Sequence, residues 1–211
     1  MLDAQSRTQA YADWLAQRPP PAEIMAGLHA GTFSRLRLDE ARAMPDDPGL
    51  SYGGYGEDRA IYDSPVFTGD GEPRTVHLGL DIFAPAGTEV FAPLAGRVHS
   101  FRDNANPLDY GPTVILEHQP VPSLVFYTLY GHLNRDSLEG LERGKPIRAG
   151  ERVGRLGEKS ENGGWPPHLH VQVMLDLMGY DGDFPGVARR SERRRWLDNC
   201  PDPGPLLGMT A

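Results

Sequence analysis

The sequence predicts a mainly β protein, an antiparallel sandwich or barrel-like domain with short helical extensions at its N- and C-termini. From Arg59 to Leu175, short apolar runs are broken by glycine and proline at intervals of roughly ten residues. Such regular alternation of strands and turns is typical of sandwiches and barrels. Helical spacing of apolar residues appears in the flanks instead, as at Tyr11, Trp14 and Leu15.

Composition and charge limit the class of protein. The chain has 211 residues, a formal net charge of −8 and one cysteine, Cys200. This length fits one domain with flanking material. The acidic balance argues against a nucleic-acid partner, and one cysteine excludes both an internal disulfide and a multi-cysteine zinc site. No apolar run approaches the ~20 residues of a membrane span, and the first residues lack the regions of a signal peptide. We therefore expect a cytoplasmic protein.

Three parts are expected along the chain. Residues 1–58 form an N-terminal helical and loop extension, 59–178 the β domain, and 179–211 an arginine-rich C-terminal extension. In the first part, Ser6 is expected to cap a helix that ends before Pro19, and a second helix is expected over 24–28. The glycine-rich residues 52–56 are interpreted as a flexible link.

The β domain should contain a series of short strands. They are expected at 60–62, 76–82, 89–92, 96–98, 113–117, 124–129, around Ile147, and at 152–154 and 169–175. In the last part, five arginines lie on a short predicted helix, where solvation or pairing with carboxylates is expected. Residues 201–205 are expected to form a loop. The five arginines are Arg189, Arg190, Arg193, Arg194 and Arg195.

Two histidines in the last predicted strand share one face. Side chains at i and i+2 project the same way in a strand, so the Cα atoms of His168 and His170 should lie about 6.6 Å apart. This spacing suits two ligands of one metal ion, or one ligand beside an acid–base group. A solvated strand face is the alternative.

A second pair, His77 and Asp81, also lies on one face of a predicted strand. In a straight strand their Cα atoms would be about 13 Å apart, too far for a shared zinc ion with bonds of about 2.0–2.2 Å. If they share a metal, the chain must bend between them, and Gly79 permits such a bend. A fourth histidine, His132, follows Gly131 at the end of another predicted strand and forms a third cluster.

These three clusters together resemble the lysostaphin/LytM-type zinc metallopeptidase family. The residues that carry the resemblance are His77-x-Gly79-x-Asp81, Tyr-Gly-His-Leu at 130–133 and His168-Leu169-His170. The linking segments 85–98 and 148–157 are also similar to that family's pattern. The resemblance covers roughly 60–176. It implies an antiparallel β fold with the site in a groove, and an endopeptidase that acts on bacterial cell-wall peptides.

Carried over position by position, the resemblance implies His77, Asp81 and His170 as ligands of Zn²⁺. Three protein ligands leave a fourth position for water, whose pKa zinc lowers toward about 7. The resemblance also implies His132 and His168 as the catalytic histidines. They would take the proton of the water and return one to the leaving amine.

Some segments depart from the family pattern. Pro166 and Pro167 replace its usual Gly-Pro, the loop 161–165 is longer, and 103–111 looks inserted; both loops are expected to form groove walls. A tyrosine that is often present just before the first metal histidine is absent from 71–76. Tyr62 and Tyr130 are the two candidates to replace it.

Other functions remain open at this point. One is a non-catalytic LytM-like module that binds cell-wall peptides or activates an enzyme. Another is a cytosolic amidase or peptidase with a substrate outside the cell wall. A third is a phosphocarrier that resembles the glucose-specific IIA protein, which needs two facing histidines but neither Asp81 nor His170. For the hydrolase, the expected partner is a peptide, such as a peptidoglycan stem or cross-link peptide.

Overall fold

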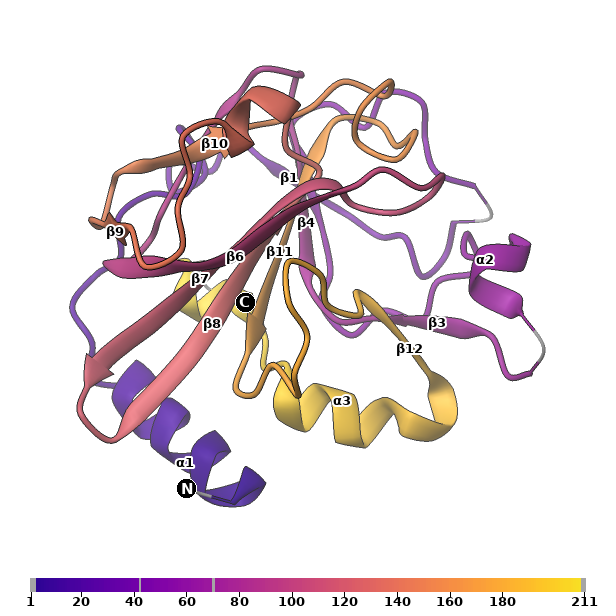
Figure 1. The fold of residues 1–211 in the computed structure, drawn as a ribbon. Coiled ribbons are helices and arrows are strands. Elements are labelled where there is room, and N and C mark those ends of the chain that lie inside the picture. The colour runs from indigo at the N-terminus through magenta and orange to yellow at the C-terminus, as the bar shows by residue number, and fades with distance from the viewer. Residues whose placement is uncertain (1–2, 42, 70, 210–211) are drawn as a thin grey trace.

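The computed structural model describes residues 3–41, 43–69 and 71–209, which form the strands and helices shown in Figure 1. The strands are β1 (Ser34–Leu36), β2 (Ser51–Gly53), β3 (Arg74–His77), β4 (Leu80–Phe83), β5 (Glu89–Phe91), β6 (Gly96–Asn104), β7 (Gly111–Val121), β8 (Leu124–Gly131), β9 (Pro146–Ile147), β10 (Arg152–Arg155), β11 (His168–Met174) and β12 (Val187–Arg189). The helices are α1 (Ala4–Leu15), α2 (Pro65–Thr68), α3 (Arg193–Asn199) and α4 (Pro203–Leu206), with 3-10 turns η1 (Arg135–Leu138) and η2 (Arg190–Glu192).

An eight-stranded sheet forms the centre, in the order β1-β2-β4-β11-β8-β7-β6-β9. Its neighbours pair antiparallel, except for the parallel pair β1–β2. Two small antiparallel sheets, β5–β10 and β3–β12, lie beside it (Figure 1). The predicted fold class, mainly antiparallel β with short terminal helices, is confirmed.

The two faces of β11 belong to different cores. Leu169 and Val171 pack in a core to which β5 and β10 also contribute. Met174 packs in a second core, to which β3 and β12 contribute. Because alternate residues share a face, His168 and His170 stand on the same side as Met174. The sheet therefore places both histidines between β11 and the β3–β12 pair.

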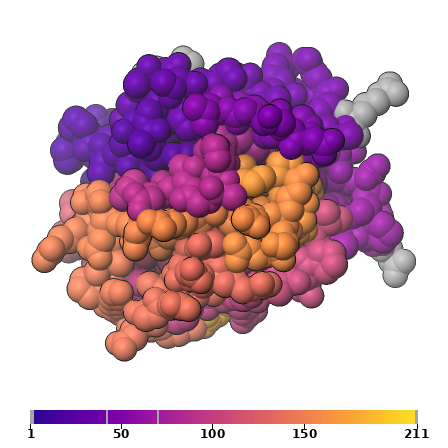
Figure 2. Space-filling model, turned by 90° about the horizontal axis from the view of Figure 1, so that it is seen from above, coloured from indigo at the N-terminus to yellow at the C-terminus, as the bar shows by residue number. Residues whose placement is uncertain are grey.

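The two terminal extensions pack against the β domain. Tyr11 of α1 contacts Phe126 of β8 with ring centroids 5.0 Å apart, and Leu206 of α4 joins the same buried cluster. The backbone of Ala22 donates to Pro93, and that of Phe91 donates to residue 24. Figure 2 shows the N-terminal segments as a continuous band along one side of the molecule. Within the described ranges, no helix is long and apolar enough to cross a membrane.

Two predicted elements of the N-terminal half are wrong. Residues 24–28 form turns rather than a helix, because Gly27 has a left-handed φ of +86° that interrupts helical geometry. Residues 60–62 also form a turn rather than a strand. After a single bridge between Asp58 and Val76, the chain turns and buries the side chains of Arg59 and Tyr62.

Three further expectations are corrected. The segment 52–56 is not a free link, because its first residues belong to β2 and pair with β4. The cap of α1 is Asp3, whose carboxylate accepts from the backbone N–H of Ser6, rather than Ser6 itself. Residues 201–205 include the start of α4, since Asp202 caps a helix that has Pro203 in its first turn.

The arginines of the C-terminal extension are on the surface, and several pair with acidic side chains as predicted. Arg190 pairs with Asp58, Arg194 contacts Asp198 at 3.9 Å, and Arg195 contacts Glu192 at 3.8 Å. These exposed pairs contribute little stability individually.

Candidate metal centre

The predicted bend at Gly79 is present and brings His77 close to Asp81. β3 ends at His77 and pairs with β12, whereas β4 begins at Leu80 and pairs with β2 and β11. A Cβ atom at Gly79 would lie 2.6 Å from the ring of His170 and 2.7 Å from the carbonyl oxygen of Val171. Glycine is therefore needed here, because His170 packs directly over the bend.

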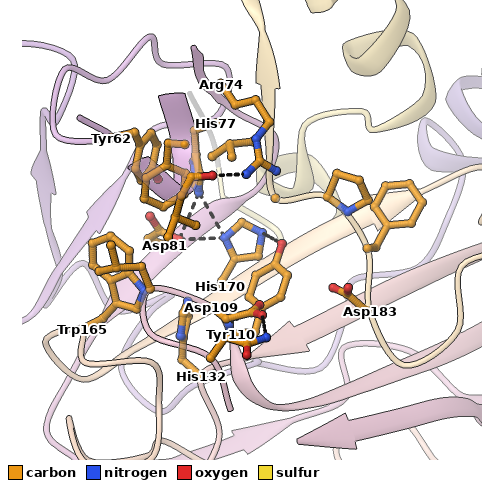
Figure 3. Close-up of a pocket in the computed structure, with 18 of the residues that line it drawn as sticks. Tyr62, Arg74, His77, Asp81, Asp109, Tyr110, His132, Trp165, His170 and Asp183 are labelled. Atoms are coloured by element: carbon orange, nitrogen blue, oxygen red, sulfur yellow. Dashed lines mark hydrogen bonds and ion pairs between the residues drawn. The ribbon is translucent and has the colours of Figure 1, made fainter. Parts of the chain in front are cut away.

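Three ligand atoms converge at this bend, as Figure 3 shows. His77 Nε2 lies 3.2 Å from Asp81 Oδ1 and 3.1 Å from His170 Nδ1. His170 Nδ1 lies 3.0 Å from Asp81 Oδ1. A tetrahedral zinc ion bonded at 2.0–2.1 Å separates its ligand atoms by roughly 3.3–3.4 Å. The triangle therefore has nearly the size that such an ion requires.

The outer nitrogens of the two histidines are bound to acceptors. His77 Nδ1 faces the carbonyl oxygen of Gly54 at 3.4 Å. His170 Nε2 lies 3.0 Å from Gln172 Oε1. The amide nitrogen of Gln172 donates to the carbonyl oxygen of Pro185, which leaves Oε1 as the acceptor for His170. Each outer nitrogen thus carries the ring hydrogen, and each inner nitrogen presents a lone pair.

The charges around the triangle also favour free lone pairs on its ligand atoms. Burial, with the nearby Arg59, lowers the pKa of His77 to about 3, so this imidazole is neutral. Burial alone would raise the pKa of Asp81, but His77 and Arg59 outweigh that effect and hold it well below its usual value. Two imidazole nitrogens and a carboxylate oxygen thus converge, and the outer ring nitrogens carry the hydrogen bonds to the acceptors. A divalent cation satisfies this donor set, so the residues fit a metal ion.

His132 and His168 lie beside the triangle, and each ring is held by a backbone carbonyl. His132 Nδ1 donates to Asn162 at 2.9 Å, and His168 Nδ1 donates to Pro166 at 2.7 Å. The two ring centroids are 4.1 Å apart. His132 has a left-handed φ of +61°. Burial lowers the pKa of both histidines, so each Nε2 presents a lone pair near neutral pH.

The sequence matches the model of peptidase family M23 over residues 75–181, just over half of the chain. The chain belongs to peptidase family M23. No curated protein sequence matches it.

Several solved structures are similar to this M23 chain. The catalytic domain of the antimicrobial peptidase lysostaphin from Staphylococcus simulans is 24% identical over 64% of this chain and 80% of its own, with a TM-score of 0.45. A zinc-containing peptidase from Vibrio cholerae is 26% identical over 63% of this chain and 35% of its own, with a TM-score of 0.43. For Csd3 of Helicobacter pylori, the identity is 23%, the coverage 59% and 32%, and the TM-score 0.38.

The M23 site opens into a cavity of about 580 Å³. On one side, an aromatic wall consists of Tyr62, Phe67 and Trp165, with neighbouring ring centroids 4.8–6.4 Å apart. On the other side lie residues 106–110 and 183–187 (Figure 3). The two loops that depart from the family pattern, 103–111 and 161–165, both contribute lining residues. Their predicted role as groove walls is confirmed.

The tyrosines of the M23 site differ in part from those expected. Of the two candidates, Tyr62 lines the cavity, but Tyr130 lies on the opposite face of the sheet, where its hydroxyl accepts from Thr128. Tyr110 was not expected and lies with its hydroxyl 3.4 Å from His170 Nε2. A sequence signal existed in Gly131, where a Cβ atom would lie 2.7 Å from the ring of Tyr110. Burial raises the pKa of Tyr62 to about 12 and that of Tyr110 well above 10, so both phenols keep their hydrogens.

Proposed function

We propose that this M23 chain is a zinc-dependent endopeptidase that hydrolyses a peptide bond. The observation that carries the proposal is the convergence of three buried lone pairs, from His77, Asp81 and His170, beside two neutral histidines in an open cavity. These three residues would hold Zn²⁺. When bound, the ion would polarise the scissile carbonyl and lower the pKa of a water molecule toward about 7.

His132 and His168 would carry the protons. Their Nδ1 hydrogens are bound to backbone carbonyls, so the Nε2 atoms are the ones that can accept. One Nε2 takes a proton from the attacking water and the pair returns one to the leaving amine. The backbone acceptors keep the rings in place and stabilise the positive charge of the protonated form.

Tyr62 would support the developing oxyanion. Its hydroxyl oxygen accepts from Arg59 Nη1 at 3.0 Å, so its own hydrogen is free to donate into the cavity. A positioned donor of this kind stabilises charge that appears only in the transition state. Tyr110, close to His170, is the second candidate donor.

For the substrate, we propose a bacterial cell-wall peptide, either a stem or a cross-link peptide. The support is the resemblance of the motifs around His77, His132 and His168 to the lysostaphin/LytM-type family. A phosphocarrier would use two facing histidines and would not need the lone pairs of Asp81 and His170, so the donor triangle favours the peptidase.

The test is the metal content of the purified protein, measured by elemental mass spectrometry. We expect about one zinc per chain, lost in His170→Ala and retained in His99→Ala, a histidine on the same sheet but outside the site. The loaded protein is then offered peptide and muropeptide libraries, with cleavage read by mass spectrometry. Absence of zinc after reconstitution would contradict the zinc chemistry, and zinc binding without cleavage of any peptide would favour a binding module.

A further inference from the structure

Arg59 is a charged side chain with no exposed surface, and it lies directly behind Asp81. Its Nη1 atom donates to Asp81 Oδ2 at 2.5 Å and to the hydroxyl of Tyr62 at 3.0 Å. Its Nε atom donates to Glu57 Oε2 at 2.9 Å. A buried guanidinium cannot lose its proton, so it is retained only where acceptors surround it. Here those acceptors include a proposed metal ligand.

Because of this contact, the two oxygens of Asp81 have different partners. Oδ1 faces His77 and His170, whereas Oδ2 is occupied by Arg59. A carboxylate can otherwise present both oxygens to a cation or rotate between them. The hydrogen bond from Nη1 occupies Oδ2, and the contacts of the same guanidinium with Glu57 and Tyr62 hold it in place. Asp81 therefore offers one oxygen to the centre.

Two glycines near Arg59 leave the space that its guanidinium and Glu57 occupy. A Cβ atom at Gly53 would lie 2.8 Å from Arg59 Nη2, and one at Gly54 would lie 2.6 Å from Glu57 Oε1. The N–H of Gly54 also donates to Glu57 Oε1 at 2.9 Å, which fixes the carboxylate that holds Arg59. The glycines of this segment thus have a packing role rather than a linking one.

The same segment also fixes the first histidine of the centre. The carbonyl oxygen of Gly54 faces His77 Nδ1. The backbone N–H of His77 donates to the carbonyl oxygen of Glu57 at 2.8 Å, and its carbonyl oxygen accepts from Gly56 at 3.0 Å. Residues 53–59 therefore contact both His77 and Asp81, although they precede the matched family segment, which begins at residue 75.

We propose that Arg59 is a positioning residue of the metal centre, which holds Asp81 as a one-oxygen ligand and directs the hydroxyl of Tyr62 into the cavity. The segment 53–59 is accordingly part of the centre. This inference rests on the proposed function, since it assigns a role toward the zinc ion. Partners of metal ligands typically change metal affinity by 10–100-fold when they are replaced.

The experiment compares the zinc affinity of full-length variants by competition with a chromogenic chelator. The double variant Glu57→Gln/Arg59→Met removes the guanidinium together with one of its two carboxylate partners. Glu57 is therefore not left as an unpaired buried charge. We expect zinc to bind 10–100-fold more weakly. Arg59→Lys keeps the charge but cannot contact Asp81, Tyr62 and Glu57 together, so a smaller loss is expected. Arg97→Lys, in an exposed pair with Glu117, is the matched control and should not change the affinity.

A second readout is the visible spectrum of the cobalt-substituted protein, which responds to coordination number. If Asp81 rotates and binds through both oxygens, the absorption of the double variant becomes weaker than that of the wild type.

Zinc affinity within twofold of the wild type and an unchanged cobalt spectrum would overturn the inference. So would an Arg59→Lys variant equal to the wild type in both readouts, because the charge alone would then suffice. Failure of both variants to fold, judged by circular dichroism, would assign Arg59 a purely structural role. A wild-type chain without zinc would instead overturn the proposed function.

Discussion

Two buried side-chain clusters, one around His77 and His170 and one around His118, lie on opposite faces of the same sheet, and only the first is suited to hold a metal. On the face away from the cavity, His118 has Nδ1 2.9 Å from the carbonyl oxygen of Ala95 and Nε2 2.7 Å from Thr128 Oγ1. Both of its nitrogens therefore have partners. In the cavity, His77 and His170 use one nitrogen each in this way and direct the other at Asp81. Both clusters are buried, so burial does not distinguish them. The difference is that the ring nitrogens of His77 and His170 that face Asp81 have lone pairs free for a metal ion.

The largest expected effect is the loss of the metal on removal of a ligand. His77→Ala or Asp81→Ala leaves two of three protein ligands, which should weaken zinc binding on the order of 10²–10³-fold and abolish turnover. The measurement is zinc content after gel filtration. His118→Ala is the matched control on the opposite face, and its zinc content should stay at the wild-type level. Equal zinc loss in this control would erase the contrast between the two clusters.

Within the cavity, His132→Ala should separate metal binding from catalysis. His132 lies outside the ligand triangle and its ring is held by Asn162, so zinc content should remain near the wild-type value. Turnover of a cleaved peptide should fall by about 10²–10⁴-fold because a proton-transfer group is lost. The measurement is kcat with zinc content determined on the same sample. Full activity in this variant would remove His132 from the mechanism.

The opposite cluster should contribute to acid stability, in addition to the buried histidines of the cavity. Burial lowers the pKa of His118 to about 4, against an ordinary value of 6.5. The unfolded chain takes up this proton below pH 6.5, whereas the folded chain does so only near pH 4. The stabilisation is therefore complete above pH 6.5 and is lost as the pH falls toward 4, by about 3 kcal/mol. Urea unfolding of the chelator-treated protein measures it, and His118→Gln should show a shallower pH dependence. Parallel curves for the two proteins would contradict this assignment.

The smallest expected effect is that of His118→Gln near neutral pH. It removes hydrogen bonds to Ala95 and Thr128, which should lower the free energy of unfolding by about 1–3 kcal/mol. Zinc content and turnover should not change. Urea unfolding at pH 7.5 with a parallel zinc assay checks both, and altered zinc content would show that the two faces of the sheet are coupled.

The motif residues and the bend between them could be predicted from the sequence. His77 and Asp81 can share an ion only if the chain turns, and Gly79 was the residue able to turn it. The pairing of His168 with His170 follows from strand periodicity alone. In each case the geometric information lies within five consecutive residues, whereas the roles of the individual residues were implied by the family resemblance.

The supporting residues could not be predicted in this way. Arg59 is 22 residues from Asp81 along the chain, and Tyr110 is 60 residues from His170. Such contacts depend on how strands pair and where loops return, which short-range patterns do not encode. The glycines before Arg59 illustrate the difficulty, because their composition resembles a linker while their actual neighbour is a guanidinium.

The hydrogen bonds of Gln172 have a consequence for the order in which the protein matures. Its amide nitrogen contacts the carbonyl oxygen of Pro185 and the sulfur of Cys200, and its oxygen fixes the tautomer of His170. A ribosome must therefore extend the chain past Cys200 before this partner set can form. Since synthesis proceeds at about 5–20 residues per second, the strands have time to pair first. The hydrogen bonds that hold Gln172 against His170 are thus completed only after residues 185–200 have been synthesised.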